Sequence, residues 1–428
     1  MNDLFIIIIC FIASLNGKNN YDYLLEWGLN NSLMISNKIE MKYENENNKS
    51  YYAKDEIDEN TLIMNIPFEI MLNIDNSLKL LNNKKLNKIF EEYKKTNFTI
   101  SVGFLPASLD QSFLSYLLYL VNHKKKHYKK SKFYQYFHYL IETFETNLDK
   151  YPMFYNERQI DLLKGSLSLL ELTLMKELYK EEVNILENLY KKTSIDFDEY
   201  LRFRTLTITK SLNISNVTSI IPFVDMFSTD PIDYNVNFKL NETNKNLYVF
   251  TTKKVKRGDI LYLRSGYFSN IKRFILYGET LEKMKDYIEA FNVPVISNLM
   301  LDTLEQKDRD KAYKIDVNID LNKKKFYKKA LKVYKKLSIL KKEDGSDLSA
   351  YKLFLKNLEL MRENYNSVTT SDIHKEFFYL KDIYNVKRVL DLEKQFLDNK
   401  LKVLRKLIND LSRKTDNKKS EERINKDL

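Results

Sequence analysis

Cysteine is almost absent from this chain of 428 residues, and its absence excludes several kinds of site. The single cysteine, Cys10, lies inside an apolar stretch near the N-terminus. A mature chain without this stretch would contain no thiol. A disulfide framework, a zinc site with cysteine ligands and a cysteine nucleophile are therefore excluded.

Glycine and proline are also scarce, at 8 and 6 residues. A fold that depends on tight turns uses both residue types, so their scarcity argues against a sheet-rich barrel and favours long helices. Hydrophobic residues make up 43% of the chain and charged residues 30%, which is enough apolar material for one or two packed domains. Collagen-like, mucin-like and multi-span membrane proteins are excluded by this composition.

The motifs of several common enzyme classes are missing as well. The chain contains no Walker A motif, no G-x-G-x-x-G and no G-x-S-x-G. Its four histidines form no ligand triad, and His123 and His127 lack the glutamate of a zincin motif. We therefore expect no metal site.

The excess of positive charge is modest, because 70 Lys and Arg stand against 59 Asp and Glu. Both signs are dense throughout, so we expect no specific nucleic-acid partner. Basic stretches occupy residues 123–132 and 323–342, and the second has the pattern of an amphipathic helix. Such a stretch is typical either of a membrane-surface or nucleic-acid contact or of a packed helix with a solvated lysine face, and we favour the packed helix.

An apolar run from Leu4 to Leu15 is too short to span a bilayer but suits the core of a signal peptide. With cleavage after Gly17, residues 1–17 would be removed and no transmembrane span would remain. This predicts entry into the secretory pathway, to the ER lumen or beyond, including an organelle reached through it. The alternative is a buried N-terminal strand in a cytoplasmic protein.

The hydrophobic periodicity predicts an α+β fold in which a β-rich core is interrupted by a long helical insert. Short β segments are expected at 35–41 and 61–66, and again at 220–224, 235–240, 247–251 and 260–263. Leucines at helical spacing predict helices between them. We expect a core of residues 18–75 and 205–284, a helical insert at 76–204, a helical C-terminal domain at 285–412 and a polar tail at 413–428.

Four stretches, in order, carry a resemblance to a known family. The first opens with Leu25-Glu26-Trp27-Gly28 and continues through residues 52–57 and 62–67. The second is the helical insert, with Tyr151-Pro152 and Leu162-Leu163-Lys164-Gly165. The third is residues 221–226 (IPFVDM), and the fourth is residues 258–263 (GDILYL) with Gly266, Ser269-Asn270 and Tyr277-Gly278.

Together these stretches resemble the SET-domain subfamily typified by the Rubisco large-subunit lysine methyltransferase, which also includes the actin-histidine methyltransferase. The C-terminal helix around Glu393 and Leu397 is similar to the end of that family's helical substrate-binding domain. The resemblance implies a SET core, S-adenosylmethionine as methyl donor, and a protein lysine or histidine as acceptor. It also implies a monomer with a protein substrate or protein partner. The residues that match the family's cofactor contacts are Ala53, Asp225, Ser228, Thr229 and Tyr277.

Departures from the family pattern fall at the expected site. Asn48 and Ser50 stand where the family has a glycine pair, and Ser228-Thr229 where it has Asn-His. Ser265 stands at the place of the catalytic tyrosine, Lys210-Ser211 at that of a Ser-Arg pair, and Glu279 at that of an aromatic cofactor contact. The tyrosines that could supply the missing hydroxyl from a shifted register are Tyr262, Tyr267 and Tyr234.

Two interpretations remain open at this point. The protein is a divergent but active methyltransferase, or it is a non-catalytic SET-fold protein that binds a protein partner or a ligand. If Ser265 occupies the tyrosine position, we expect Tyr262 or Tyr267 to point into the channel beside it.

Overall fold

The computed structural model describes most of the chain. The described residues are 20–45, 48–81, 84–95, 101–102, 105–106, 109–123, 133–164, 166–190, 194–214, 217–266, 268–282, 292–294, 318–320, 326–340, 344–364, 370–377 and 380–427. The predicted signal peptide at 1–17, most of the basic stretch at 123–132 and Tyr267 lie outside them, and the predictions made for them stay predictions.

The chain forms two compact units. The first comprises Met1–Ile100, Ala107–Leu148 and Tyr179–Tyr267, and the second comprises Ser101–Pro106, Asp149–Leu178 and Phe268–Leu428. Each unit therefore collects segments that are far apart in the sequence. The boundaries expected near residues 75, 204 and 284 stay predictions.

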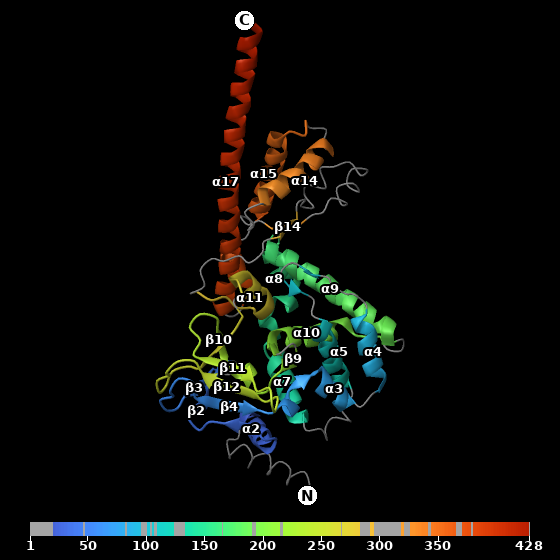
Figure 1. Cartoon of the computed structure of the whole chain (residues 1–428), viewed down its shortest axis with the longest axis vertical. Helices are drawn as coiled ribbons and strands as arrows, with labels where there is room; N and C mark the ends of the chain where they lie inside the picture. Colours follow the sequence, from blue (N-terminus) through green and yellow to red (C-terminus); the bar gives the residue numbers. More distant parts are fainter. Residues whose placement is uncertain are drawn as a thin grey trace. The chain divides into compact units, whose positions relative to one another are not determined.

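A mixed six-stranded sheet is the largest sheet of the first unit and lies to one side of its helices α3 (Ile74–Leu81), α4 (Lys84–Lys94), α5 (Leu109–His123) and α10 (Phe197–Lys210) (Figure 1). Its order is β1 (Met34–Ile35), β4 (Leu62–Ile66), β12 (Leu247–Thr251), β11 (Val236–Leu240), β13 (Tyr262–Arg264) and β10 (Ser228–Asp230). β4 and β11 both pair antiparallel with β12, whereas β11 and β10 pair parallel with β13. Strands from the two ends of the unit's sequence thus share one sheet, as the α+β prediction requires.

Smaller β elements flank this sheet in the first unit. β2 (Ile39–Asn45) and β3 (Asn48–Ala53) form a hairpin, while β5 (Leu72–Asn73), β9 (Val217–Ile220) and β8 (Ser211–Ile214) form a three-stranded sheet. The expected strand at 220–224 is wrong. β9 ends at Ile220, and a 3-10 turn, η4 (Val224–Met226), follows. Pro222 lacks a backbone N–H and Phe223 has φ +69°, so the chain cannot continue as a strand there.

The most buried helix of the first unit is α5 (Leu109–His123), which is buried without interruption from Ser112 to Val121 and packs against α3, α4 and α10. The others are α2 (Asn20–Asn30), α3 (Ile74–Leu81), α4 (Lys84–Lys94), α7 (Tyr134–Glu145) and α10 (Phe197–Lys210). The long helix α9 (Leu167–Tyr190) is divided between the two units at Tyr179.

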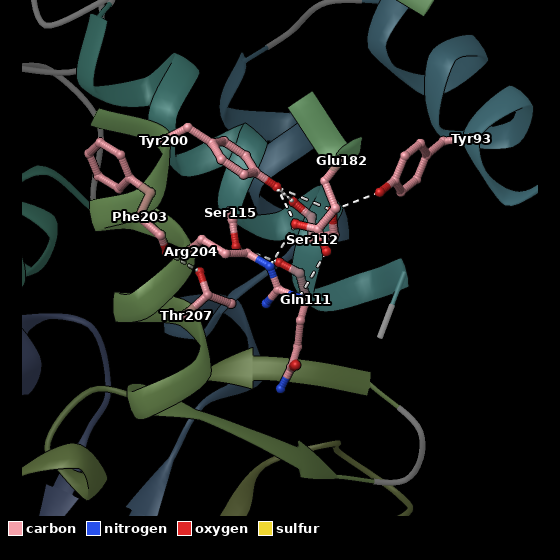
Figure 2. Close-up of polar contacts among 9 residues, drawn as sticks. All are labelled: Tyr93, Gln111, Ser112, Ser115, Glu182, Tyr200, Phe203, Arg204 and Thr207. Carbon is pink, nitrogen blue, oxygen red and sulfur yellow. Dashed lines mark hydrogen bonds and ion pairs between the residues drawn. The ribbon is translucent and has the colours of Figure 1, made fainter. Parts of the chain in front are cut away.

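A buried ion pair joins α9 to α10 within the first unit (Figure 2). Arg204 donates from Nε to Glu182 Oε2 at 2.9 Å and from Nη2 to Oε1 at 3.1 Å. Tyr200 donates to the same carboxylate at 2.9 Å and contacts Ser112, which in turn contacts Tyr93 of α4 at 2.7 Å. Burial lowers the pKa of Arg204, and the Glu182 charge more than reverses this effect, so the guanidinium stays charged. The network fixes the register of α10, whose last residue, Lys210, reaches the candidate site.

The second unit is mainly helical. It contains α8 (Glu157–Leu162), α11 (Asn270–Tyr277), α14 (Phe326–Leu340), α15 (Asp347–Asn364), α16 (Thr370–Glu376) and α17 (Leu380–Asp427), with the short strands β6 (Ser101–Val102), β7 (Leu105–Pro106), β14 (Asn292–Pro294) and β15 (Asn318–Asp320). α17 has 48 residues and runs beyond α14 and α15 (Figure 1). Ile408 is the last buried residue among those of α17 whose side chains are described, and the helix itself continues to Asp427 through the predicted polar tail. None of the described helices is long and apolar enough to cross a membrane.

Candidate functional site

The residues expected to bind a cofactor gather around η4 in the first unit. Phe223 precedes η4 and is held at its positive φ by two residues of α2. The Trp27 ring stacks on Phe223 at 6.4 Å between centroids, and a Cβ on Gly28 would lie 2.8 Å from the Phe223 ring. Trp27 and Gly28 therefore pack against the residue that leads into the turn containing Asp225 and Met226.

Tyrosine hydroxyls surround η4, and the sequence analysis missed them. Tyr51 of β3 and Tyr139 of α7 each donate to Met226 Sδ at 3.9 Å, and Tyr21 of α2 donates to Tyr51 at 3.3 Å. With 30 tyrosines in the chain, no single one stood out. The only available signal was the position of Tyr51 directly before the motif stretch 52–57, two residues before Ala53.

Asp225 sets the electrostatics of this cluster. Burial raises the pKa of Tyr136 well above its usual value, and the Asp225 charge raises it further. Burial, the neighbouring Tyr21 and Asp225 raise the pKa of Tyr51 in the same way. Both phenols therefore stay protonated at any physiological pH.

β3 lies beside the loop that leads into β13. Leu261 donates its amide to Tyr51 O at 2.9 Å, Ala53 to Asp259 O at 2.9 Å, and Gly258 to Ala53 O at 2.7 Å. Ala53, one of the expected cofactor contacts, is buried with its backbone fully engaged by these bonds.

Ser50 of β3 occupies the space that a glycine would leave open. Its side chain is 2% exposed, and its Oγ accepts a hydrogen bond from the Ser228 amide at 3.1 Å. The side chain of Asn48 lies outside the described residues. β3 and β10 were both expected to contact the cofactor. The side chain of Ser50 joins these two strands directly.

The parallel pairing of β10 with β13 brings two groups of expected site residues together. Ser228 lies opposite Tyr262, and Thr229 lies opposite Leu263. Tyr262 is half-buried, and Tyr234 packs its ring 5.3 Å from the Arg264 guanidinium. Both tyrosines therefore lie at the same sheet edge as the expected cofactor contacts.

Ser265 follows β13 directly. Its Oγ is buried, and no hydrogen-bond partner for it exists within the described ranges. A buried hydroxyl without a partner costs free energy unless a ligand or water satisfies it. Among the described hydroxyls at this sheet edge, that of Ser265 would therefore gain most from a hydrogen bond to a ligand.

Lys210 brings a cation to η4. Its Nζ donates to the Asp225 carbonyl at 3.3 Å, and the side chain is half-buried. No carboxylate of the described residues lies within ion-pair distance of it. Ser211 stands at the place of the arginine in the expected Ser-Arg pair, but Lys210 directly before it brings a positive charge to η4.

Tyr277, the last of the expected cofactor contacts, belongs to the second unit. It ends α11, whose N-terminus is capped by Ser269 through a bond from the Lys272 amide at 3.2 Å. Burial raises the pKa of Tyr277, and the nearby Arg273 opposes this effect. Gly278 follows at φ +66°, where a Cβ would lie 1.9 Å from Lys150 O, so glycine is required there.

Elsewhere, the described residues offer no comparable site. Across the described ranges, no three His, Cys, Asp or Glu side chains gather as they would to hold a metal ion. A groove of about 950 Å³ between α15 and α17 is lined by the ion pairs Arg362–Asp398 and Arg405–Glu359. Its walls carry both signs of charge and none of the expected site residues.

Comparison with known proteins identifies the fold. Neither a family model nor a curated protein matches the chain. Solved structures do: the SET domain of LSMT bound to lysine and AdoHcy matches with a TM-score of 0.57 at 13% identity, covering 90% of this chain and 91% of that one. Rubisco LSMT bound to sinefungin and monomethyllysine matches with a TM-score of 0.58 at 13% identity, covering 92% and 94%.

The chain has the SET fold. The predicted α+β class with a SET core is therefore confirmed. Rubisco LSMT bound to AdoMet matches equally over 92% of this chain, with a TM-score of 0.56 at 13% identity. At such identity the scaffold is shared while most side chains differ, which agrees with the departures found in the SET-like motifs.

Proposed function

We propose that this SET-fold protein is an S-adenosylmethionine-dependent methyltransferase that acts on a lysine, or on a histidine, of a protein substrate. The observation that carries the proposal is the parallel pairing of β10 with β13. Ser228 lies opposite Tyr262 in this pairing, which supports a site in which an expected cofactor contact lies next to a candidate hydroxyl. The neighbours of known structure hold lysine or monomethyllysine together with AdoHcy or sinefungin, which supports this choice of reaction.

The residues present fit a zwitterionic donor on two counts. The buried Ser265 Oγ has no partner among the described residues, and Lys210 carries a half-buried positive charge without a carboxylate partner there. A ligand with a carboxylate and polar groups would satisfy both. Lys210, Asp225, Ser228 and Thr229, all of the first unit, would hold the donor.

The bound donor supplies an electrophilic methyl group on a sulfonium. In the transfer, a nitrogen–carbon bond forms as the sulfur–carbon bond breaks, and the acceptor nitrogen later releases a proton to solvent. The residues of this chain must align the acceptor and keep it neutral. A lysine has an ordinary pKa of about 10.4, and a desolvated site favours its neutral form. The hydroxyls of Ser265 and Tyr262 are the groups we assign to orient the amine.

A second candidate function, a non-catalytic SET-fold binding protein, is favoured by one specific observation. The Ser50 hydroxyl accepts a hydrogen bond from the Ser228 amide, and the side chain fills space between β3 and β10. A protein that no longer bound the donor would tolerate this side chain without loss. The two candidates differ in whether the donor binds.

Titration calorimetry on the full chain separates them. The proposal predicts heat of binding with S-adenosylmethionine and with its demethylated product, followed by methyl transfer to a lysine-rich peptide detected by mass spectrometry. Absence of binding to both at millimolar ligand would reject the enzyme and leave the binding protein. Binding without transfer to any lysine or histidine peptide would also reject catalysis.

A further inference from the structure

Asn235 bonds to both backbone groups of Tyr262, the residue of the candidate hydroxyl. The Asn235 amide donates to the Tyr262 carbonyl at 3.0 Å, and its side-chain Oδ1 accepts the Tyr262 amide at 2.7 Å. Its side-chain Nδ2 donates to the Ile260 carbonyl at 2.8 Å. One residue therefore satisfies three backbone groups at the start of β13, two of them through its side chain. The sequence analysis treated residue 235 only as the start of a strand.

The ladder between β11 and β13 is otherwise short. It consists of a single pair, Val236 with Leu263, whereas the ladder between β10 and β13 has three pairs. A short ladder specifies register weakly, and asparagine side chains readily bond to backbone groups. The Asn235 side chain therefore acts as a further ladder position that holds β13 in register with β11.

Asn235 is itself held in one orientation. It is 7% exposed, and its carbonyl accepts the Thr252 amide at 2.9 Å, just past β12. With the bonds to residues 260 and 262, each of its four polar groups has a partner. The two ends of the side-chain amide are also distinguished, because Oδ1 faces an N–H group and Nδ2 faces a carbonyl. Any other orientation would leave a buried donor or acceptor unpaired, which costs free energy.

On its other side, the segment that leads into β13 is bonded to β3. Ile260 forms an antiparallel bridge with Tyr52, and the Leu261 amide donates to the Tyr51 carbonyl at 2.9 Å. These bonds and the ladder with β10 do not involve Asn235. Loss of its side chain should therefore let β13 move relative to β11 while the sheet stays formed.

We propose that Asn235 is a positioning residue, whose side-chain amide sets the register of β13 against β11 and thereby fixes where the hydroxyls of Tyr262 and Ser265 stand relative to Ser228. The consequence for catalysis rests on the proposed function, in which those hydroxyls orient the acceptor. The structural part of the proposal does not, because it concerns only where Tyr262 lies.

The test places 3-fluorotyrosine at position 262 of the full chain and records its fluorine NMR signal. We expect a single resonance, and Asn235→Ala should shift or split it, because both side-chain bonds are lost. Asn237→Ala is the matched control on the same strand. The Asn237 Oδ1 accepts the Phe238 amide at 2.9 Å, and no bond of its side chain to β13 is found among the described residues. An unchanged resonance in Asn235→Ala would overturn the proposal.

Asn235→Asp offers a conservative rescue with its own pH profile. The carboxylate keeps an acceptor for the Tyr262 amide but sets an oxygen against the Ile260 carbonyl. Burial and this oxygen raise the pKa of the introduced carboxyl, and its protonated form again donates to Ile260. We expect the fluorine resonance to approach that of the parent as pH falls from about 8 towards 5. A change in stability alone would alter the folded fraction and leave the resonance of the folded form in place, which would contradict the proposal.

Hydrogen exchange of the unaltered chain covers the case in which neither variant folds. The Tyr262 amide should be protected, because its acceptor is a buried side chain that cannot turn away. Exchange at the rate of an exposed amide would show that the bond does not hold, and the proposal would fail.

Methyl transfer gives a separate readout. If the parent is active, Asn235→Ala should lower kcat about tenfold to a hundredfold, because a misplaced hydroxyl no longer aligns the acceptor. The loss in kcat should exceed any loss in affinity for S-adenosylmethionine. A kcat equal to that of the parent would remove Asn235 from the reaction. An inactive parent would reject the proposed function alone, since the fluorine and exchange results still decide whether Asn235 positions Tyr262.

Discussion

Ser50 and Ser228 are 178 residues apart in the sequence, yet the hydroxyl of the first accepts the backbone amide of the second at 3.1 Å. The bond ties β3 to β10 at the place where a glycine and an open backbone were expected. It is the described contact that bears most directly on whether the donor has room to bind.

Replacing Ser50 tests this directly. Ser50→Gly should free the Ser228 amide and raise the affinity for S-adenosylmethionine in calorimetry. It should cost about 1 kcal/mol for the lost hydrogen bond, with about 0.5–1 kcal/mol more for glycine in a strand. Ser50→Ala is the control, because it removes the bond but keeps the Cβ. An equal gain in affinity with alanine would show that the bond, and not the space, limits binding.

Ser265 should matter for ligand binding more than for stability. Its Oγ already lacks a described partner, so Ser265→Ala should change the free energy of unfolding by less than about 1 kcal/mol. If the hydroxyl contacts ligand, the same change should weaken donor binding or methyl transfer. A variant with unaltered binding and activity would remove Ser265 from the site.

The reverse change at this position distinguishes the two functions. We expect Ser265→Tyr to clash with the side chains beside it rather than to restore a conventional active site, and thus to lower stability. Clear methyl transfer by this variant, from a parent without activity, would identify the lost ring as the main defect. The non-catalytic interpretation of the parent would then rest on that one residue.

Gly28 should tolerate no side chain. A Cβ there would lie 2.6 Å from Leu33 Cδ2 and 2.8 Å from the Phe223 ring, so Gly28→Ala should cost about 1–3 kcal/mol in urea unfolding. Because Phe223 leads into η4, the change should also disturb Asp225. Leu29→Ala, at an exposed position of the same helix, should have a much smaller effect and serves as the control.

The buried pair of Glu182 and Arg204 should respond asymmetrically to substitution. Arg204→Met leaves a buried carboxylate without its counterion and should cost about 3–5 kcal/mol. Adding Glu182→Leu should recover much of this loss, since an apolar pair needs no desolvation. The exposed pair Arg405–Glu359 offers a control, where Arg405→Met should cost less than about 1 kcal/mol in thermal unfolding. Equal losses at the two sites would contradict the account.

Much of the secondary structure was predictable because it depends on local pattern. The scarcity of glycine and proline indicated long helices, and alternating residues at 247–251 indicated a strand that is buried on one face, as β12 is. The strand expected at 220–224 does not form, and hydrophobic periodicity gives no sign of the cause. Its apolar residues are buried by Trp27 and Tyr21 from α2, which hold Phe223 in a turn.

By itself, then, the sequence determined the α+β class, the order of β and helical segments, and the family pattern together with its departures, because these depend on residues near one another along the chain. Only the tertiary structure decided which of the residues at and around the expected site contact one another. It placed Ser50 against Ser228, and Tyr51 and Tyr139 on Met226, pairs that are separated by 87 to 178 residues. Such contacts depend on how strands pair and helices pack, and their energies arise from burial that a linear pattern does not record.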